Sequence, residues 1–155
     1  MASDKTTDKI GLRYGFFAGI FMIVYFLILT ALGINNKEEA RMAGFIFIIL
    51  AVMMAIVKYK RVQGNVMPYL PGLGIGFVIG LVGSLLYGIF IMIYTSYVDA
   101  EYQNTLRTDD YFGSLSPVIL CMAFALMGLV IGAFTAYILM MLYDKSGGRT
   151  ADKNI

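Results

Sequence analysis

Residues 67–98 read MPYLPGLGIGFVIGLVGSLLYGIFIMIYTSYV and contain no Asp, Glu, Lys, Arg or His. About 20 apolar residues, at a rise of 1.5 Å each, cross the roughly 30 Å hydrocarbon core of a bilayer as an α-helix. This stretch is longer than one crossing needs, and two prolines stand near its beginning. We therefore expect an irregular or interfacial start at residues 67–71 and a tilted membrane helix at residues 72–98. A re-entrant segment at residues 68–76 is the alternative.

Three further apolar runs are long enough to cross a membrane once their flanking residues are included: residues 14–34, 38–59 and 117–143. Asn36 followed by Glu39 predicts a capped start for the second helix. Ser116 before Pro117 predicts an N-cap for the last. A cleavable signal peptide is the alternative for the first run, which is longer than the usual apolar region of such peptides. The sequence predicts an all-α fold, an integral membrane four-helix transmembrane bundle in one domain over residues 1–155.

Composition supports this class. Hydrophobic residues make up 59% of the chain and charged residues 14%, against roughly 45–50% and about 25% in soluble domains. The formal net charge of +2 gives no support to a nucleic-acid partner. Cys121 is the one cysteine and there is no histidine, which excludes an internal disulfide, a dithiol redox centre and haem ligation by histidine.

The lysines and arginines divide unevenly between the two sides that four crossings create. Nine fall before the first run, after the second and after the fourth: Lys5, Lys9, Arg13, Lys58, Lys60, Arg61, Lys145, Arg149 and Lys153. Only Lys37, Arg41 and Arg107 fall on the other side. Short cytoplasmic segments carry the excess of basic residues in membrane proteins. We therefore predict that both chain ends are cytoplasmic, an N-in and C-in topology.

Small residues recur at every fourth position of the third run: Gly72, Gly76, Gly80, Ser84 and Gly88. A shorter series stands in the fourth run: Gly128, Gly132 and Ala136. Gly11, Gly15 and Gly19 lead into the first run. Such stripes let helix backbones approach closely in lipid, where water does not drive association. We interpret them as packing faces between helices of one chain; a self-association or partner-docking face, and a pore-lining stripe, are the alternatives.

The apolar runs lack the side chains that membrane chemistry needs. Proton relays, ion pathways and substrate pockets use intramembrane ionisable residues, so we expect no catalytic, cofactor-binding or metal-binding residue. The polar groups inside the runs are hydroxyls, among which Ser84 and Tyr87 are the most suggestive of a polar contact. The acidic segment at residues 99–113 matches no cation-binding motif and is interpreted as a solvated loop. The basic residues Lys58, Lys60 and Arg61 could attract anionic lipid, at about 1 kcal/mol per residue.

Four motifs in the middle of the chain resemble the DUF4199 family. They are KYKR at residues 58–61, QG at 63–64, a glycine-rich helix ending in SLLY at 84–87, and YVDAEY at 97–102. That family groups small four-helix membrane proteins of bacteria, mainly Bacteroidota, whose function is undefined. The resemblance implies a location in the inner membrane, and it brings no catalytic residue.

These observations favour a non-enzymatic role, as an accessory or scaffold subunit that forms a homo-oligomer or joins a larger membrane complex. An oligomeric channel or small transporter for a neutral or weakly polar solute is the alternative. An intramembrane enzyme ranks third, because the runs offer no acid–base pair. The helical plan itself decides nothing among these, since function depends on sites.

The predicted topology can be tested with single cysteines in a Cys121→Ser background. A cysteine at Asn104 should react with a membrane-impermeant reagent in intact cells. A cysteine at Gln63 should react only after permeabilisation, because it follows a basic segment that stays inside. Labelling of both positions from outside would contradict the four-crossing, N-in topology.

Overall fold

The computed structural model describes residues 2–34, 38–62, 69–98 and 116–147. Its helical elements, in chain order, are α1 (Ala2–Ala31), α2 (Glu38–Met42), the 3₁₀ turn η1 (Ala43–Phe45), α3 (Ile46–Val62), α4 (Tyr69–Tyr97) and α6 (Pro117–Gly147). No strand occurs in these ranges. Four helices are long and apolar enough to cross a membrane: Thr7–Ala31, Ala43–Val62, Tyr69–Tyr97 and Pro117–Tyr143. The predicted fold class, an all-α multi-pass membrane protein, is confirmed.

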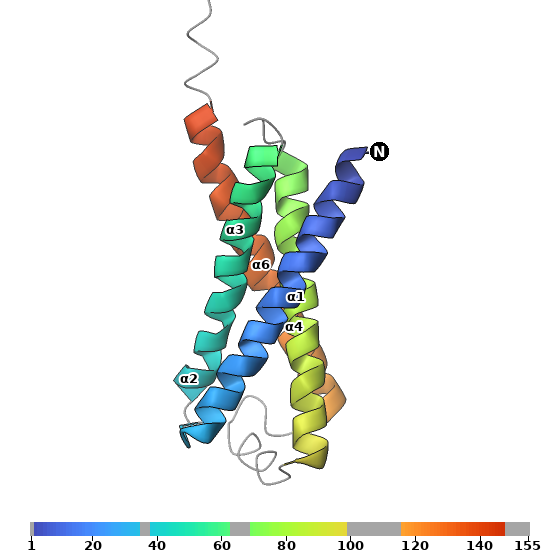
Figure 1. The fold of residues 1–155 in the computed structure, drawn as a ribbon, viewed down its shortest axis with the longest axis vertical. Helices are drawn as coiled ribbons and strands as arrows, with labels where there is room; N and C mark the ends of the chain where they lie inside the picture. Colours follow the sequence, from blue (N-terminus) through green and yellow to red (C-terminus); the bar gives the residue numbers. More distant parts are fainter. Residues whose placement is uncertain (1, 35–37, 63–68, 99–115, 148–155) are drawn as a thin grey trace, which may run out of the picture.

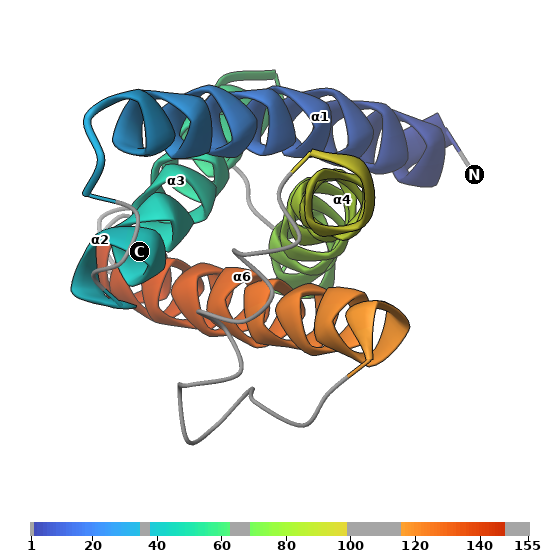
Figure 2. The same ribbon diagram turned by 90° about the horizontal axis from the view of Figure 1, so that it is seen from below.

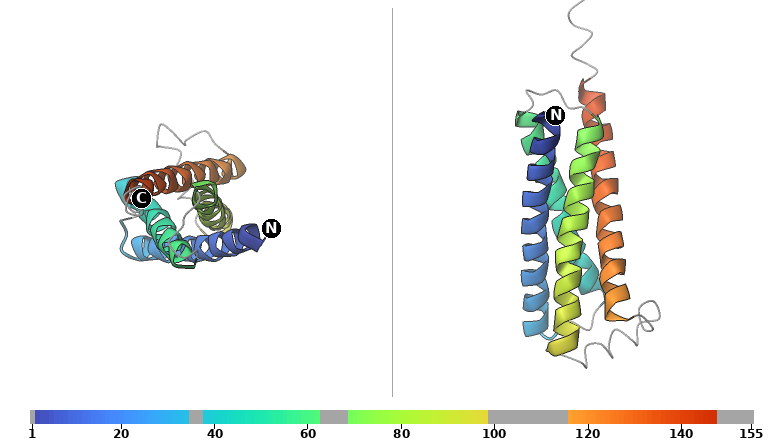
Figure 3. Two further views of the ribbon diagram at one scale, coloured as in Figure 1. Left: turned by 90° about the horizontal axis from the view of Figure 1, so that it is seen from above. Right: turned by 90° about the vertical axis from the view of Figure 1, so that its right-hand side faces the viewer.

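The helices form a four-membered bundle in which α4 lies between α1 and α6 (Figures 2 and 3). Helix α3 completes the bundle on the other side. The most extensive contact joins α4 to α6, and the next joins α1 to α4. Helices α1 and α4 run in the same direction, opposite to α3 and α6 (Figure 1). The beginning of α1 and the end of α6 therefore lie at the same end of the bundle.

The first helix begins and ends earlier than the apolar run predicts. Helix α1 starts at Ala2, because polar residues at the membrane boundary extend a helix without leaving a hydropathy signal. It ends at Ala31, where Gly33 adopts a left-handed conformation with φ of 67°. The amide of Ile34 donates to the carbonyl of Leu29 at 3.1 Å, and the amide of Gly33 to that of Thr30 at 3.1 Å. These two bonds form a Schellman cap, which ends the helix at Ala31 although the apolar run continues to residue 34.

The second crossing is a broken helix, in which α2 and η1 precede α3. The phenol of Tyr25 in α1 donates to the carbonyl of Ala40 in α2 at 3.1 Å, which fixes this turn against the first helix. The predicted cap residue Asn36 lies outside the described residues. Helix α3 then continues to Val62, past the predicted end at residue 59.

The third crossing is more regular than predicted. Helix α4 begins at Tyr69, so Pro71 is its third residue and residues 69–71 are helical rather than irregular or re-entrant. The first-turn amides of a helix have no partner within it, so proline is accommodated there. Residues 67 and 68 lie outside the described residues.

The fourth helix has the predicted start and a later end. The amide of Ile119 donates to the side-chain oxygen of Ser116 at 3.4 Å, as an N-cap does. Helix α6 then runs to Gly147, beyond the predicted end at residue 143.

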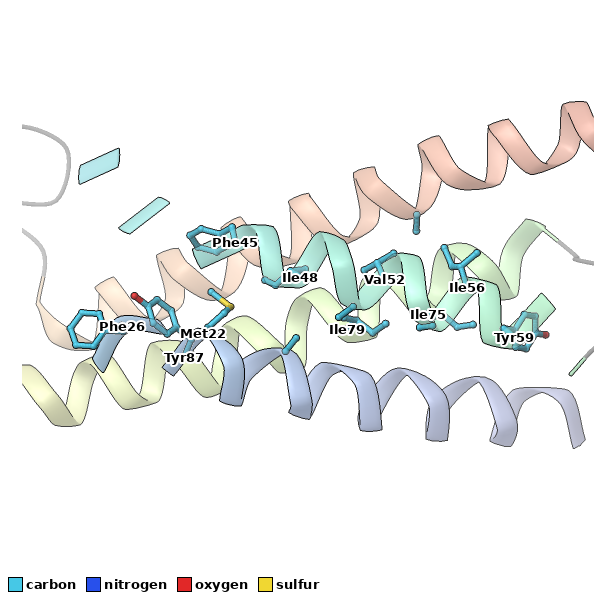
Figure 4. Close-up of a cluster of buried hydrophobic side chains, with 14 of the residues drawn as sticks. Met22, Phe26, Phe45, Ile48, Val52, Ile56, Tyr59, Ile75, Ile79 and Tyr87 are labelled. Atoms are coloured by element: carbon cyan, nitrogen blue, oxygen red, sulfur yellow. The ribbon is translucent and has the colours of Figure 1, made fainter. Parts of the chain in front are cut away.

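Large apolar side chains fill the space between the helices along the whole bundle (Figure 4). The largest fully buried ones include Met22, Phe26, Ile48, Val52, Ile56, Tyr59, Ile75 and Ile79. At the end where α1 finishes, the Phe26 ring meets three other rings edge-on. Its centroid lies 6.3 Å from Tyr87, 5.8 Å from Phe90 and 5.2 Å from Tyr94. Edge-to-face rings add to the energy of burial, so this aromatic cluster ties α1 to α4.

Phe26→Ala is expected to lower stability strongly, because the Phe26 side chain is 1% exposed and its loss leaves a cavity. Substitutions of this kind cost about 3–5 kcal/mol. Phe77→Ala on α4 is the matched control, since Phe77 is 46% exposed on the bundle surface. Thermal unfolding in detergent should show a large drop in Tm for Phe26→Ala alone. Equal Tm values for both variants would contradict the assigned core.

Candidate functional site

All eight small residues predicted to pack helices are buried: Gly72, Gly76, Gly80, Ser84, Gly88, Gly128, Gly132 and Ala136. The structure brings them together along the contact between α4 and α6, which we call the α4–α6 seam. Successive turns of α4 meet successive turns of α6 in antiparallel order. Gly72 lies against Met140, Gly76 against Ala136, and Gly88 against Cys121.

The α4–α6 seam is a contact between backbones. A Cβ atom on Gly76 would lie 2.6 Å from the carbonyl oxygen of Gly132. A Cβ atom on Gly80 would overlap the carbonyl of Gly128 and lie 3.1 Å from the Cα of Leu129. Real Cβ atoms essentially never approach other atoms within 3.0 Å. These positions therefore require glycine for the helices to lie this close.

Ser84 adds a polar contact to the same seam. Its hydroxyl lies 2.5 Å from the carbonyl oxygen of Gly80, one turn back, and 3.1 Å from that of Ala125 on α6. The side chain is fully buried. Interhelical hydrogen bonds in membrane bundles contribute about 0.6 kcal/mol on average. Because backbone carbonyls accept from this hydroxyl, Ser84 is accounted for as a packing residue.

A second small-residue contact, the α1–α4 seam, lies on another side of α4. Cβ atoms on Gly11 and Gly15 would lie 3.0 Å from those of Val78 and Val82. Gly83 faces the same way, and a Cβ atom there would lie 3.2 Å from the carbonyl oxygen of Gly15. The every-fourth-residue pattern misses Gly83, which adjoins the stripe without belonging to it. The series Gly11, Gly15 and Gly19 in α1 was the sequence signal for this second contact. A row of glycines leaves a groove on a helix, and side chains of a neighbouring helix must fill it.

Hydroxyls within the helices donate to the carbonyl four residues earlier in the same helix. The oxygen–oxygen distances are 2.9 Å for Thr30, 2.9 Å for Thr95 and 2.7 Å for Thr135. Tyr87, predicted to make a polar contact, lies in the aromatic cluster with its ring centroid 5.6 Å from that of Phe124. Within the described ranges no three His, Cys, Asp or Glu side chains gather as a metal site would require. The acidic segment at residues 99–113 lies outside them.

Basic side chains gather at the end of the bundle where α1 begins. The Lys58 ammonium lies 5.8 Å from the ring centroid of Tyr14 on α1. The Lys60 ammonium lies 4.4 Å from the ring centroid of Tyr143 on α6. Arg61 is exposed. Two of the three residues predicted to contact anionic lipid thus lie over tyrosine rings, an arrangement that stabilises a cation at a boundary.

Two open apolar grooves, each of about 520 Å³, lie on the surface of the bundle. One runs between α3 and α6 and includes Met53, Val130 and Phe134. The other lies beside the α1–α4 seam, near the basic end, and includes Lys9 and Arg13.

A family model described as "Protein of unknown function (DUF4199)" matches residues 13–109 of the chain. The match covers α3 and α4 and most of α1, and it ends before α6. No match was found among curated proteins or among solved structures.

Because of the backbone contact at Gly80, we expect alanine to change the stability of the protein differently at two glycines of α4. Gly80→Ala should separate α4 from α6 and lower stability by about 1–3 kcal/mol, as overpacking does. Gly74→Ala is the matched control, because nothing lies within 4 Å of a Cβ atom there. Alanine is the better helix former by roughly 0.5–1 kcal/mol, so this variant should be neutral or more stable. Equal tolerance of both changes in thermal unfolding would contradict the seam.

Proposed function

The chain belongs to the DUF4199 family, for which no function is defined, and we propose that it is a non-enzymatic accessory or scaffold subunit of the bacterial inner membrane. In this role it contributes a stable helical framework to a homo-oligomer or to a larger membrane complex. Lipid is its immediate environment, and no cofactor or nucleic acid takes part.

One observation carries this proposal: the small-residue stripe of α4 is used within the chain. A channel built along the stripe would need Gly76, Gly80 and Ser84 to face water. Instead, Gly80 lies in backbone contact with Gly128, and the Ser84 hydroxyl is within hydrogen-bonding distance of backbone carbonyls. Ion conduction requires pore-lining groups that replace the hydration of the ion. The α4–α6 seam leaves no such groups exposed, which favours a structural role.

The chemistry of the side chains supports the same role. The sequence places no Asp, Glu, Lys, Arg or His in the central part of any of the four crossings. A proton-coupled transporter or an intramembrane hydrolase needs titratable groups at that depth. The hydroxyls of Thr30, Thr95 and Thr135 are engaged with their own helices. A bundle without charged side chains at its centre is the arrangement expected of a scaffold.

The charge of the bundle ends supports an orientation. The basic side chains Lys9, Arg13, Lys58, Lys60 and Arg61 belong to the ends of α1 and α3 that lie together, as the contact between Lys58 and Tyr14 requires. We assign this end to the cytoplasm, following the excess of basic residues on cytoplasmic segments. Both chain ends are then cytoplasmic.

The scaffold proposal predicts that the pure protein moves no solute. Reconstituted into liposomes, it should give no ion or proton flux above empty controls. Osmotic swelling with small polyols, followed by light scattering, extends the test to neutral solutes. A reproducible flux that Ser84→Ala or Tyr87→Phe abolishes, in variants that keep the wild-type Tm, would overturn the scaffold proposal and establish the channel.

A further inference from the structure

The groove beside the α1–α4 seam has an apolar lining to which the side chains of two basic residues contribute. Its lining residues are Lys9, Leu12, Arg13, Phe16, Phe17 and Val82, and its volume is about 520 Å³. All but Val82 belong to α1, and Val82 belongs to α4. Leu12, Phe16 and Phe17 are about half exposed or more, so the groove opens towards the surroundings of the bundle.

The helical repeat sets the order of these groups along the membrane normal. Lys9 and Arg13 are four residues apart, so they lie one above the other on the same face of α1. The apolar crossing begins at Thr7, which puts both basic residues in its first two turns. Phe16 and Phe17 follow one turn deeper. Lysine and arginine in such positions lie along apolar surface and extend their charges to the membrane boundary.

We propose that this groove binds one anionic glycerophospholipid, with its phosphate at Lys9 and Arg13 and an acyl chain along Leu12, Phe16 and Val82. The two basic side chains and the apolar lining match the two parts of that molecule in the order in which a bilayer presents them. Basic pockets between membrane helices on the cytoplasmic side bind anionic headgroups elsewhere by the same chemistry.

Charge complementarity distinguishes this groove from the other candidates. The groove between α3 and α6 has the same volume, but no basic residue is among those that line it, so it has no cation to offer a phosphate. The predicted basic cluster on α3 has two lysines over tyrosine rings and lines neither groove. Asp8 is exposed on the same turn of α1 as Lys9 and does not line the groove.

Occupancy of the groove also bears on stability. Val82 packs against Gly15 in the α1–α4 seam, so a chain lying on Val82 touches both helices at their contact. A ligand that binds only the folded bundle stabilises it by mass action. Anionic lipid should therefore raise the Tm of the protein, and a zwitterionic lipid of equal chain length should raise it less.

The test is lipid binding to the full chain in detergent, measured by native mass spectrometry and by Tm, with phosphatidylglycerol and phosphatidylcholine of equal chain length. The wild-type protein should retain one phosphatidylglycerol on the order of tenfold more readily than phosphatidylcholine, since each basic side chain contributes a few-fold. The double variant Lys9→Gln, Arg13→Gln should lose this preference. Its Tm without lipid should stay at the wild-type value, because both side chains are exposed.

The double variant Lys60→Gln, Arg61→Gln removes the same charge from α3 and serves as the matched control. It should keep the preference for phosphatidylglycerol. An equal loss in both double variants would show attraction to the whole basic end and would overturn the site. The site is equally overturned if the wild-type protein does not distinguish the two lipids, or if inorganic phosphate at the same concentration displaces phosphatidylglycerol. The outcome does not depend on the scaffold proposal.

Discussion

The close approach of the α4 and α6 backbones is the constraint on which the rest of the bundle depends. Lipid tails are as apolar as leucine side chains, so burying an apolar surface against another helix gains little in a membrane. Dispersion supplies much of the attraction, and a gap of about 0.5–1 Å beyond contact already loses a quarter to a half of it. By omitting Cβ atoms at Gly76, Gly80 and Gly128, the sequence lets whole backbone surfaces meet. Ser84 adds one polar contact where the two surfaces already touch.

Small residues also give α4 a close neighbouring helix on each of two sides. Gly83 faces α1 while Gly80 faces α6, and the two positions are less than one helical turn apart. Helix α3 is held differently, by large side chains such as Ile48, Val52 and Ile56 that reach into the space the other helices leave. The bundle thus joins two backbone seams to a conventional apolar core.

The sequence predicted the number of crossings, which follows from the length of the apolar runs, and the buried face of α4, which follows from the four-residue spacing of its small residues. It did not predict where helices end, since the Gly33 cap and the helical residues 69–71 depend on backbone conformation rather than hydropathy. Periodicity also could not identify which helix packs on a given face of α4. The small-residue stripe shows which face is buried, but α1, α6 or another chain could pack against it. The groove at Lys9 and Arg13 required the fold, because Val82 joins it from a distant helix.

The two seams together also set the register of α4 along the bundle axis. A slide of α4 by four residues, about 6 Å, would keep small residues opposite small residues over most of the α4–α6 seam. In one direction, however, it would bring Met92 to the place of Gly88, against Cys121. The same slide would put Phe90 where Leu86 now meets Gly19. The large side chains Met92 and Phe90, which follow the small residues of α4, therefore oppose a slide in this direction. The register of α4 is fixed against that slide even though the glycines of the α4–α6 seam are interchangeable.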